Sequence, residues 1–209
     1  MLVFFCSVLK PRQIVLCATL VAASAGPAAA NDCPPAPDHA AELAALTGQV
    51  QAAEGEGEAR AFASRMWELW TDAPDEQAQA ILDRGMARRT TFNFLGALED
   101  FDALVEYCPE FAEGYNQRAF VYYLNGEFES ALTDLDHALG LSPLHIGALS
   151  GRALTLMGLM RMEEARETLG IALELNPWLP ERGLIAPGGP LSQDEDDGKT
   201  SSGRQEFDL

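Results

Sequence analysis

Positive charge is scarce in this chain. Its 209 residues carry 14 lysines and arginines against 32 aspartates and glutamates, a formal net charge of −18. No lysine lies between Lys10 and Lys199. Coulomb repulsion makes nucleic acids and anionic membrane surfaces poor partners for such an acidic chain. We therefore expect no nucleic-acid partner and attribute the charge to solubility, with a basic protein partner as the alternative.

Catalytic and metal-binding motifs are also missing. The sequence contains no glycine-rich phosphate loop, no metal-ligand spacing and no nucleophile elbow. Histidine is limited to His39, His137 and His145. Asp134, Asp136 and His137 form a D-x-D-H string, but on a helix Asp136 points away from the other two, and no second histidine is placed to help. The sequence therefore predicts a solvated helix face there, and no metal, cofactor or enzymatic activity.

Long uninterrupted apolar runs are absent, and the N-terminal run is short. Lys10 and Arg12 precede IVLCATLVAA (14–23), and small residues follow up to Ala30. This order is typical of a secretory signal peptide, so we expect residues 1–30 to be cleaved. Their removal takes away two bases and no acids, which changes the net charge from −18 to −20. We expect export, to the bacterial periplasm, and no membrane insertion of the mature chain; a retained anchor is the alternative.

Few cysteines remain after such a cleavage. Cys6 and Cys17 leave with the signal peptide, and Cys33 and Cys108 stay. An oxidising compartment favours a disulfide between them, and two cysteines allow one connectivity. It would close a loop of about 75 residues, which the chain-entropy model values at about 4 kcal/mol. Two separate thiols are the alternative.

What the sequence does contain is a repeat with a period of 34 residues. Alanines and prolines recur in columns at this spacing, with Leu104 in place of one alanine: Ala97, Ala131 and Ala165; Leu104, Ala138 and Ala172; Pro109, Pro143 and Pro177. Self-similarity at a fixed period is the signature of repeat architectures. The register defines three copies, at 78–111, 112–145 and 146–179.

These copies resemble the tetratricopeptide repeat (TPR) family. The family pattern has a large, a small and an aromatic residue on the first helix, then alanine, a large residue and proline on the second. The two later copies match it with Tyr115, Ala119, Tyr122, Ala131, Leu135, Ala138 and Pro143, and with Leu149, Ala153, Leu156, Ala165, Leu169, Ala172 and Pro177. The first copy departs from it, because Arg88 replaces the aromatic residue and Leu104 the second alanine. The resemblance covers about half of the chain.

The resemblance implies an all-α fold, a TPR-like α-solenoid of antiparallel helix pairs. Since one copy cannot bury its apolar face alone, stability comes from stacking. Upstream, 31–77 is expected to form N-terminal helices with a degenerate fourth repeat, and Trp67 and Trp70 are expected to pack in the core. Downstream, 180–186 would begin a capping helix, and the acidic tail 187–209 would be disordered.

Three arginines also follow the 34-residue period. Arg84, Arg118 and Arg152 each precede the small residue of a first helix. A basic ladder for an acidic ligand is one interpretation. We instead expect these arginines to pair with acids of the second helices, such as Asp100 or Asp134.

The resemblance also implies a binding surface, because family members hold a peptide or a partner's helix on the concave side lined by the first helices. The register carries this groove to Leu82, Met86, Arg89, Asn116, Phe120, Tyr123, Ser150, Leu154 and Met157. Asn116 would bond to a peptide backbone, while Phe120 and Tyr123 offer rigid apolar area. Packing of these two aromatics on neighbouring helices is the alternative.

The expected function is therefore that of a non-enzymatic, exported protein-interaction module. Family members that grip a C-terminal carboxylate use lysine, asparagine and arginine in the groove, and here only Asn116 fits that pattern. An apolar or mixed peptide is the better expectation. A self-associating scaffold or assembly factor in the cell envelope is the first alternative, and a metal-dependent or hydrolytic enzyme is the second.

Overall fold

The computed structural model describes residues 33–193 of the chain. Within this range it contains α-helices and one short 3₁₀-helix, and no strand. The helices are α1 (Ala40–Ala52), α2 (Glu56–Trp70), α3 (Glu76–Thr90), α4 (Phe94–Tyr107), α5 (Ala112–Leu124), α6 (Phe128–Leu141), α7 (Ile146–Gly158), α8 (Met162–Leu175) and the 3₁₀-helix η1 (Pro180–Leu184). The predicted all-α solenoid is confirmed. The predicted signal peptide lies outside the described residues.

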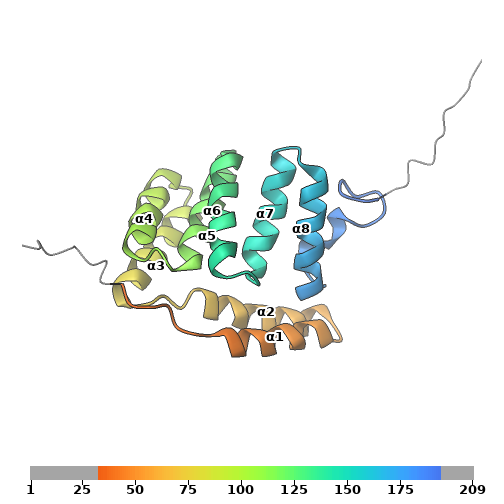
Figure 1. The fold of residues 1–209 in the computed structure, drawn as a ribbon, viewed down its shortest axis with the longest axis horizontal. Coiled ribbons are helices and arrows are strands. Elements are labelled where there is room, and N and C mark those ends of the chain that lie inside the picture. The colour runs from red at the N-terminus through yellow and green to blue at the C-terminus, as the bar shows by residue number, and fades with distance from the viewer. Residues whose placement is uncertain (1–32, 194–209) are drawn as a thin grey trace, which may run out of the picture. The chain divides into compact units, whose positions relative to one another are not determined.

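Helices α3 to α8 form three antiparallel pairs that stand side by side (Figure 1). The two helices of each pair approach closely because small residues lie between them. Ala119, Ala131 and Ala138 are fully buried in one cluster with Leu135 and Ala148. Larger side chains at these alanines would separate the backbones, so the alanine columns of the sequence are helix contacts.

Polar caps start several of these helices. The Asp75 carboxylate accepts a hydrogen bond from the Ala78 N–H at 2.8 Å at the start of α3. His145 Nδ1 accepts one from the Ala148 N–H at 3.2 Å at the start of α7. Each cap satisfies a backbone donor that the first helical turn leaves unpaired.

The turn inside each pair uses a left-handed residue at the same register position. These residues are Phe92, Gly126 and Met160, with φ of 61°, 77° and 60°. Glycine adopts this conformation without strain, whereas phenylalanine and methionine do not. Phe92 and Met160 are also 81% and 75% exposed, so no burial compensates the strain.

The periodic arginines lie on first helices, where Arg118 and Arg152 each bind the second helix of their own copy and that of the preceding copy. Arg118 Nε donates to Asp134 of its own copy at 2.7 Å, and Nη1 donates to Asp102 of the preceding copy at 2.8 Å. Arg152 repeats this with Asp136 of the preceding copy at 2.7 Å, and with the Thr168 hydroxyl of its own copy at 2.6 Å.

The first copy has the same pairing, since Arg84 Nε donates to Asp100 at 2.8 Å. The prediction that these arginines pair with second-helix acids is confirmed. The D-x-D-H string belongs to the same arrangement, because Asp134 and Asp136 bind arginines and the His137 ring lies 4.0 Å from that of Tyr115.

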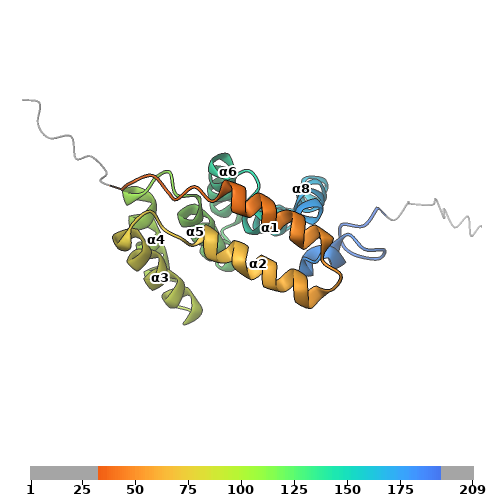
Figure 2. The same cartoon turned by 90° about the horizontal axis from the view of Figure 1, so that it is seen from below.

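The N-terminal hairpin of α1 and α2 does not continue the stack, contrary to the expected fourth repeat. Figure 2 shows it crossing the helix pairs lengthwise. Its apolar side chains, among them Val50 and Met66, cluster with Ile146 of α7 and with Trp178 and Leu179 beyond α8. The degenerate pattern marked the helices correctly, but the apolar face packs against the last copies and not against α3.

The chain after α8 covers the end of the last copy. The 3₁₀-helix η1 begins where a capping helix was expected, and the backbone then turns so that the Leu191 N–H donates to the Leu184 carbonyl at 2.8 Å. Leu191 is 3% exposed in the last apolar cluster. The expectation of disorder from Pro187 is therefore wrong for 187–193, because Leu191 is buried, and 194–209 lie outside the described residues.

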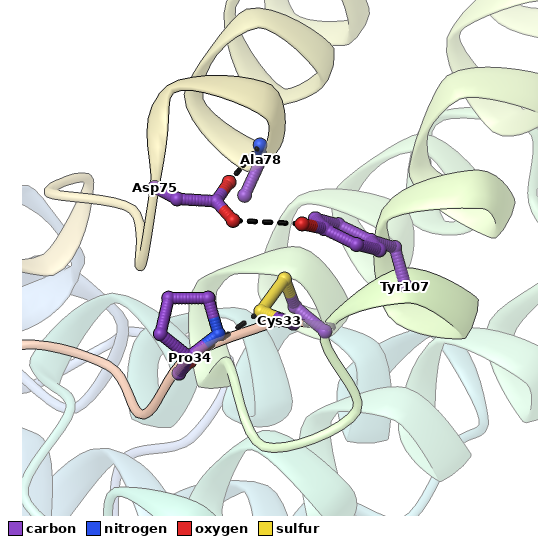
Figure 3. The surroundings of a disulfide bond; sticks show 6 residues. Cys33, Pro34, Asp75, Ala78 and Tyr107 are labelled. Carbon is purple, nitrogen blue, oxygen red and sulfur yellow. Dashed lines mark hydrogen bonds between the residues drawn. A yellow bond between two sulfur atoms is a disulfide. The ribbon is translucent and has the colours of Figure 1, made fainter. Parts of the chain in front are cut away.

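A disulfide joins the start of the described chain to the end of α4. Cys33 and Cys108 are bonded with their Cα atoms 5.3 Å apart (Figure 3). Nearby, the Tyr107 hydroxyl donates to Asp75 at 2.7 Å. The Ala78 N–H and this hydroxyl together hold the pKa of the Asp75 carboxyl below its usual range. The segment before α1 is thus fixed beside the first copy.

Candidate binding cavity

A cavity of about 370 Å³ lies between α2 and the face formed by the first helices α5 and α7. We call it the α2 cavity. Its walls are mainly apolar, and α3 contributes Arg89 at one end while η1 contributes Glu181 at the other. Since α3 and η1 stand at opposite ends of the array in Figure 1, these two charged residues come from elements at opposite ends of the array.

Most of the predicted groove residues meet at this cavity. Six of the nine line it: Arg89, Asn116, Phe120, Tyr123, Ser150 and Leu154. The other three do not. Leu82 is fully buried in the first apolar cluster, so its assignment to the groove is wrong. Met86 and Met157 pack against the first and last apolar clusters, outside the cavity lining.

The wall opposite these residues comes from α2 and was not predicted. Met66, Trp67 and Trp70 line it. Trp70 fits the expected packing role, since its ring stacks on the His145 ring with centroids 4.3 Å apart. Trp67 is 38% exposed and faces the cavity, so core packing is the wrong assignment for it. The helical spacing predicted that both tryptophans lie on one apolar face of α2, but it did not predict which part of the protein that face contacts.

A buried carboxylate lies next to the cavity. Glu113 is 1% exposed and accepts hydrogen bonds from Asn116 Nδ2 at 2.9 Å and from the Gln117 amide. His145 Nδ1 accepts the Ala148 N–H, so Nε2 carries the ring proton and donates to Glu113 at 2.9 Å. Three donors therefore satisfy this carboxylate.

Sequence reasoning missed this network, because Glu113 and His145 occupy different register positions and have no counterparts in the other copies. It also changes the role of Asn116, which was expected to bond to a peptide backbone. One side-chain N–H of Asn116 is committed to Glu113. The network fixes Asn116 and Gln117 where they line the cavity.

Arg89 is the cation of the α2 cavity. It is half-buried, its guanidinium carbon lies 4.7 Å from the centre of the Phe120 ring, and Nη1 donates to the Gln117 side-chain oxygen. Burial lowers the pKa of Arg89, and the Glu113 charge opposes that shift. Among the residues 33–193, every other arginine forms an ion pair within 4.0 Å, namely Arg60, Arg65, Arg84, Arg88, Arg118, Arg152, Arg161, Arg166 and Arg182.

Among the described residues, no three or more His, Cys, Asp or Glu side chains gather in a way that would hold a metal ion. None of the helices within 33–193 combines the length and the apolar character needed to cross a bilayer.

Stacked antiparallel helix pairs with a fixed 34-residue period define an α-solenoid repeat protein. No family model matches the chain. It is 37% identical over 60 residues to a TPR repeat-containing protein of Rhizobium etli, covering 29% of each chain. It is also 37% identical over 70 residues to a tetratricopeptide repeat protein 36 homolog of Nematostella vectensis, covering 34% of this chain and 38% of that one. Together with the helix pairs, these matches show that the repeats of this chain are similar to tetratricopeptide repeats.

The chain spans less than two fifths of the length of these two relatives. Among solved structures, it is similar to the first TPR domain of Spaghetti bound to an HSP90 peptide, at 24% identity and a TM-score of 0.48, covering 49% of this chain and 82% of that one. It is also similar to the TPR2B domain of yeast Sti1 in a pHsp70 complex, at 22% identity and a TM-score of 0.48, covering 55% of this chain and 90% of that one.

Proposed function

We propose that this chain is a non-enzymatic protein-interaction module that binds a peptide or a partner's helix at the α2 cavity. One observation carries the proposal: large apolar side chains from separate helices converge there and stay accessible. Phe120 is 44% exposed and Trp67 38%, and both line the cavity. Rigid aromatic side chains around a concave site are the usual anchors of protein interfaces.

The surrounding charge favours an apolar or mixed segment over a strongly acidic one. The chain carries a surplus of acids, and Arg89 is the one basic residue in the cavity lining. A segment with many carboxylates would be repelled by the surplus and would find one cation. We propose that the partner contributes apolar side chains with few charges.

We also propose that the chain is exported before it binds its partner. The order of basic, apolar and small residues in 1–30 supports export. The disulfide between Cys33 and Cys108 is compatible with an oxidising compartment such as the periplasm. The partner would then be another protein of the cell envelope.

The binding surface is tested by comparing the proteins captured by the wild-type chain with those captured by the double variant Phe120→Ala/Tyr123→Ala. We expect the variant to lose the specific partner, because truncation of two central aromatic anchors typically costs 2 kcal/mol or more, about thirtyfold in affinity. Proximity labelling or pull-down with quantitative mass spectrometry gives the readout.

The matched control is Phe92→Ala/Leu95→Ala, which removes comparable apolar side chains that are 81% and 73% exposed and lie outside the cavity lining. Circular dichroism of each variant establishes that its helices persist. If the cavity variant keeps the wild-type partner list, or if the control loses the same partner, the proposed surface is wrong.

A further inference from the structure

The α2 cavity contains buried polar atoms that the fold leaves without partners. Within the described residues, Ser150 Oγ, Thr155 Oγ1 and Glu181 Oε2 are buried and accept or donate no hydrogen bond, and all three residues line this cavity. Ser150 is 8% exposed and Thr155 is fully buried. Unpaired buried polar atoms destabilise a folded protein, so their concentration at one cavity points to a ligand that supplies the missing partners.

The cavity is lined by two side chains of opposite charge, which come from α3 and η1 at opposite ends of the array. Arg89 brings a cation at the α3 end that has no ion pair with any described residue, and Glu181 brings an acceptor at the η1 end. The carboxylate that acts on Arg89 belongs to Glu113, which already accepts from three donors. An acid group at the α3 end and a hydrogen-bond donor at the η1 end would complement this arrangement.

The body of the cavity is aromatic and small. Trp67, Phe120 and Tyr123 line it, and the volume is about 370 Å³. Pockets for small molecules range from about 300 to 1,000 Å³ and combine apolar walls with a few placed polar groups. Helix α2, which lies outside the repeats, closes the cavity on the side opposite α5 and α7.

We propose that the α2 cavity binds a small amphipathic acid: a molecule with one carboxylate, an aromatic or compact apolar body, and a hydrogen-bond donor at the opposite end. The carboxylate pairs with Arg89, the body lies between Trp67 and Phe120, and the donor reaches the polar atoms near Thr155 and Glu181. The acid would occupy the same cavity as the protein partner proposed above, so the two ligands would compete for it.

The test measures direct binding of 3-(4-hydroxyphenyl)propionate to the purified chain. Its amide is the uncharged probe of equal shape, and 3-phenylpropionate lacks the phenolic donor. We expect saturable binding of the acid, about tenfold tighter than that of the amide, because a charged pair in a partly buried site contributes about this factor. Removal of the phenolic hydroxyl weakens binding several-fold. Calorimetry gives the affinities, and shifts of the Trp67 indole resonance in NMR spectra give the location.

Arg89→Met tests the carboxylate contact, because it keeps the apolar stem and removes the charge. We expect it to lower the affinity for the acid to that of the amide while leaving the amide unchanged. Arg60→Met is the matched control, since Arg60 is exposed, pairs with Glu56 on α2 and lies outside the cavity lining. It should bind the acid as the wild type does.

Three outcomes overturn the proposal: no saturable binding of the acid up to its solubility limit, equal affinity for acid and amide, or equal loss in both arginine variants. Each is separable from the partner experiment, because partner capture is read with Phe120 and Tyr123 variants and needs no acid. An unchanged partner list for Phe120→Ala/Tyr123→Ala, with acid binding by the wild type intact, would reject the protein-interaction surface and leave the small-molecule site standing.

Discussion

Thr155 presents a conflict between packing and hydrogen bonding within one side chain. It sits fully buried on α7, and its hydroxyl has no partner among the described residues. Elsewhere helical threonines bond to the carbonyl four residues earlier, as Thr133 does to Glu129 at 3.0 Å. The hydroxyl of Thr155 is therefore retained at a cost to the free protein, which is what a binding residue would show.

Thr155→Val should accordingly stabilise the ligand-free chain by about 1 kcal/mol, because valine has the same shape and leaves no polar atom unpaired. Chemical denaturation followed by circular dichroism measures the change. Thr133→Val is the control, since this threonine is exposed and its hydroxyl is bonded, and it should be neutral or slightly destabilising. A destabilised Thr155→Val chain would mean that the hydroxyl already has a partner.

Among the elements, the turns within the helix pairs differ in strain although their backbones are alike. Gly126 occupies the left-handed position in the middle copy, and Phe92 and Met160 occupy it in the others. A left-handed residue with a side chain costs about 1 kcal/mol relative to glycine. The outer two turns therefore store strain that the middle turn lacks.

Replacing Met160 with glycine should release this strain. The expected gain is up to about 1 kcal/mol, reduced by the larger conformational freedom of glycine in the unfolded chain. Gly126→Ala is the reverse change and should lose a similar amount, and thermal unfolding of the two variants gives both signs. If Met160→Gly lowers the stability, the exposed side chain must hold a contact that outweighs the backbone strain.

The same elements explain what sequence reasoning reached and what it missed. The repeat array was predictable because Ala131, Ala138 and their counterparts report local contacts within a fixed register. The position of the α1–α2 hairpin was not predictable. The spacing of Trp67 and Trp70 defines an apolar helix face but does not determine which helices it packs against. The pair of Glu113 and His145 was missed for a related reason: it joins two copies through positions that do not repeat.

For the whole molecule, the disulfide decides how firmly the N-terminal segment holds the first copy. Cys33→Ser should lower the free energy of unfolding by up to about 4 kcal/mol, since it opens a loop of 75 residues in the unfolded chain. Thermal unfolding of the variant measures this, and the intact mass of the wild type before and after reduction reports the bond. The wild type unfolded under reducing conditions should match the variant. An unchanged stability would show that the segment contributes nothing to the fold.

The hairpin and the segment before it are attached to the array at two places, beside the first copy and at the last copy. Cys33 binds the first copy through Cys108, and the Gln51 amide donates to the Glu174 carbonyl of the last copy at 2.7 Å. A solenoid without such attachments can change the pitch of its repeats to fit a ligand, because each repeat contacts only the repeats next to it. An N-terminal region attached to both the first and the last copy fixes the pitch of the helix pairs before a ligand binds. Recognition at the α2 cavity would then proceed by side-chain rotation against a rigid frame, which favours ligands of one size over a range of lengths.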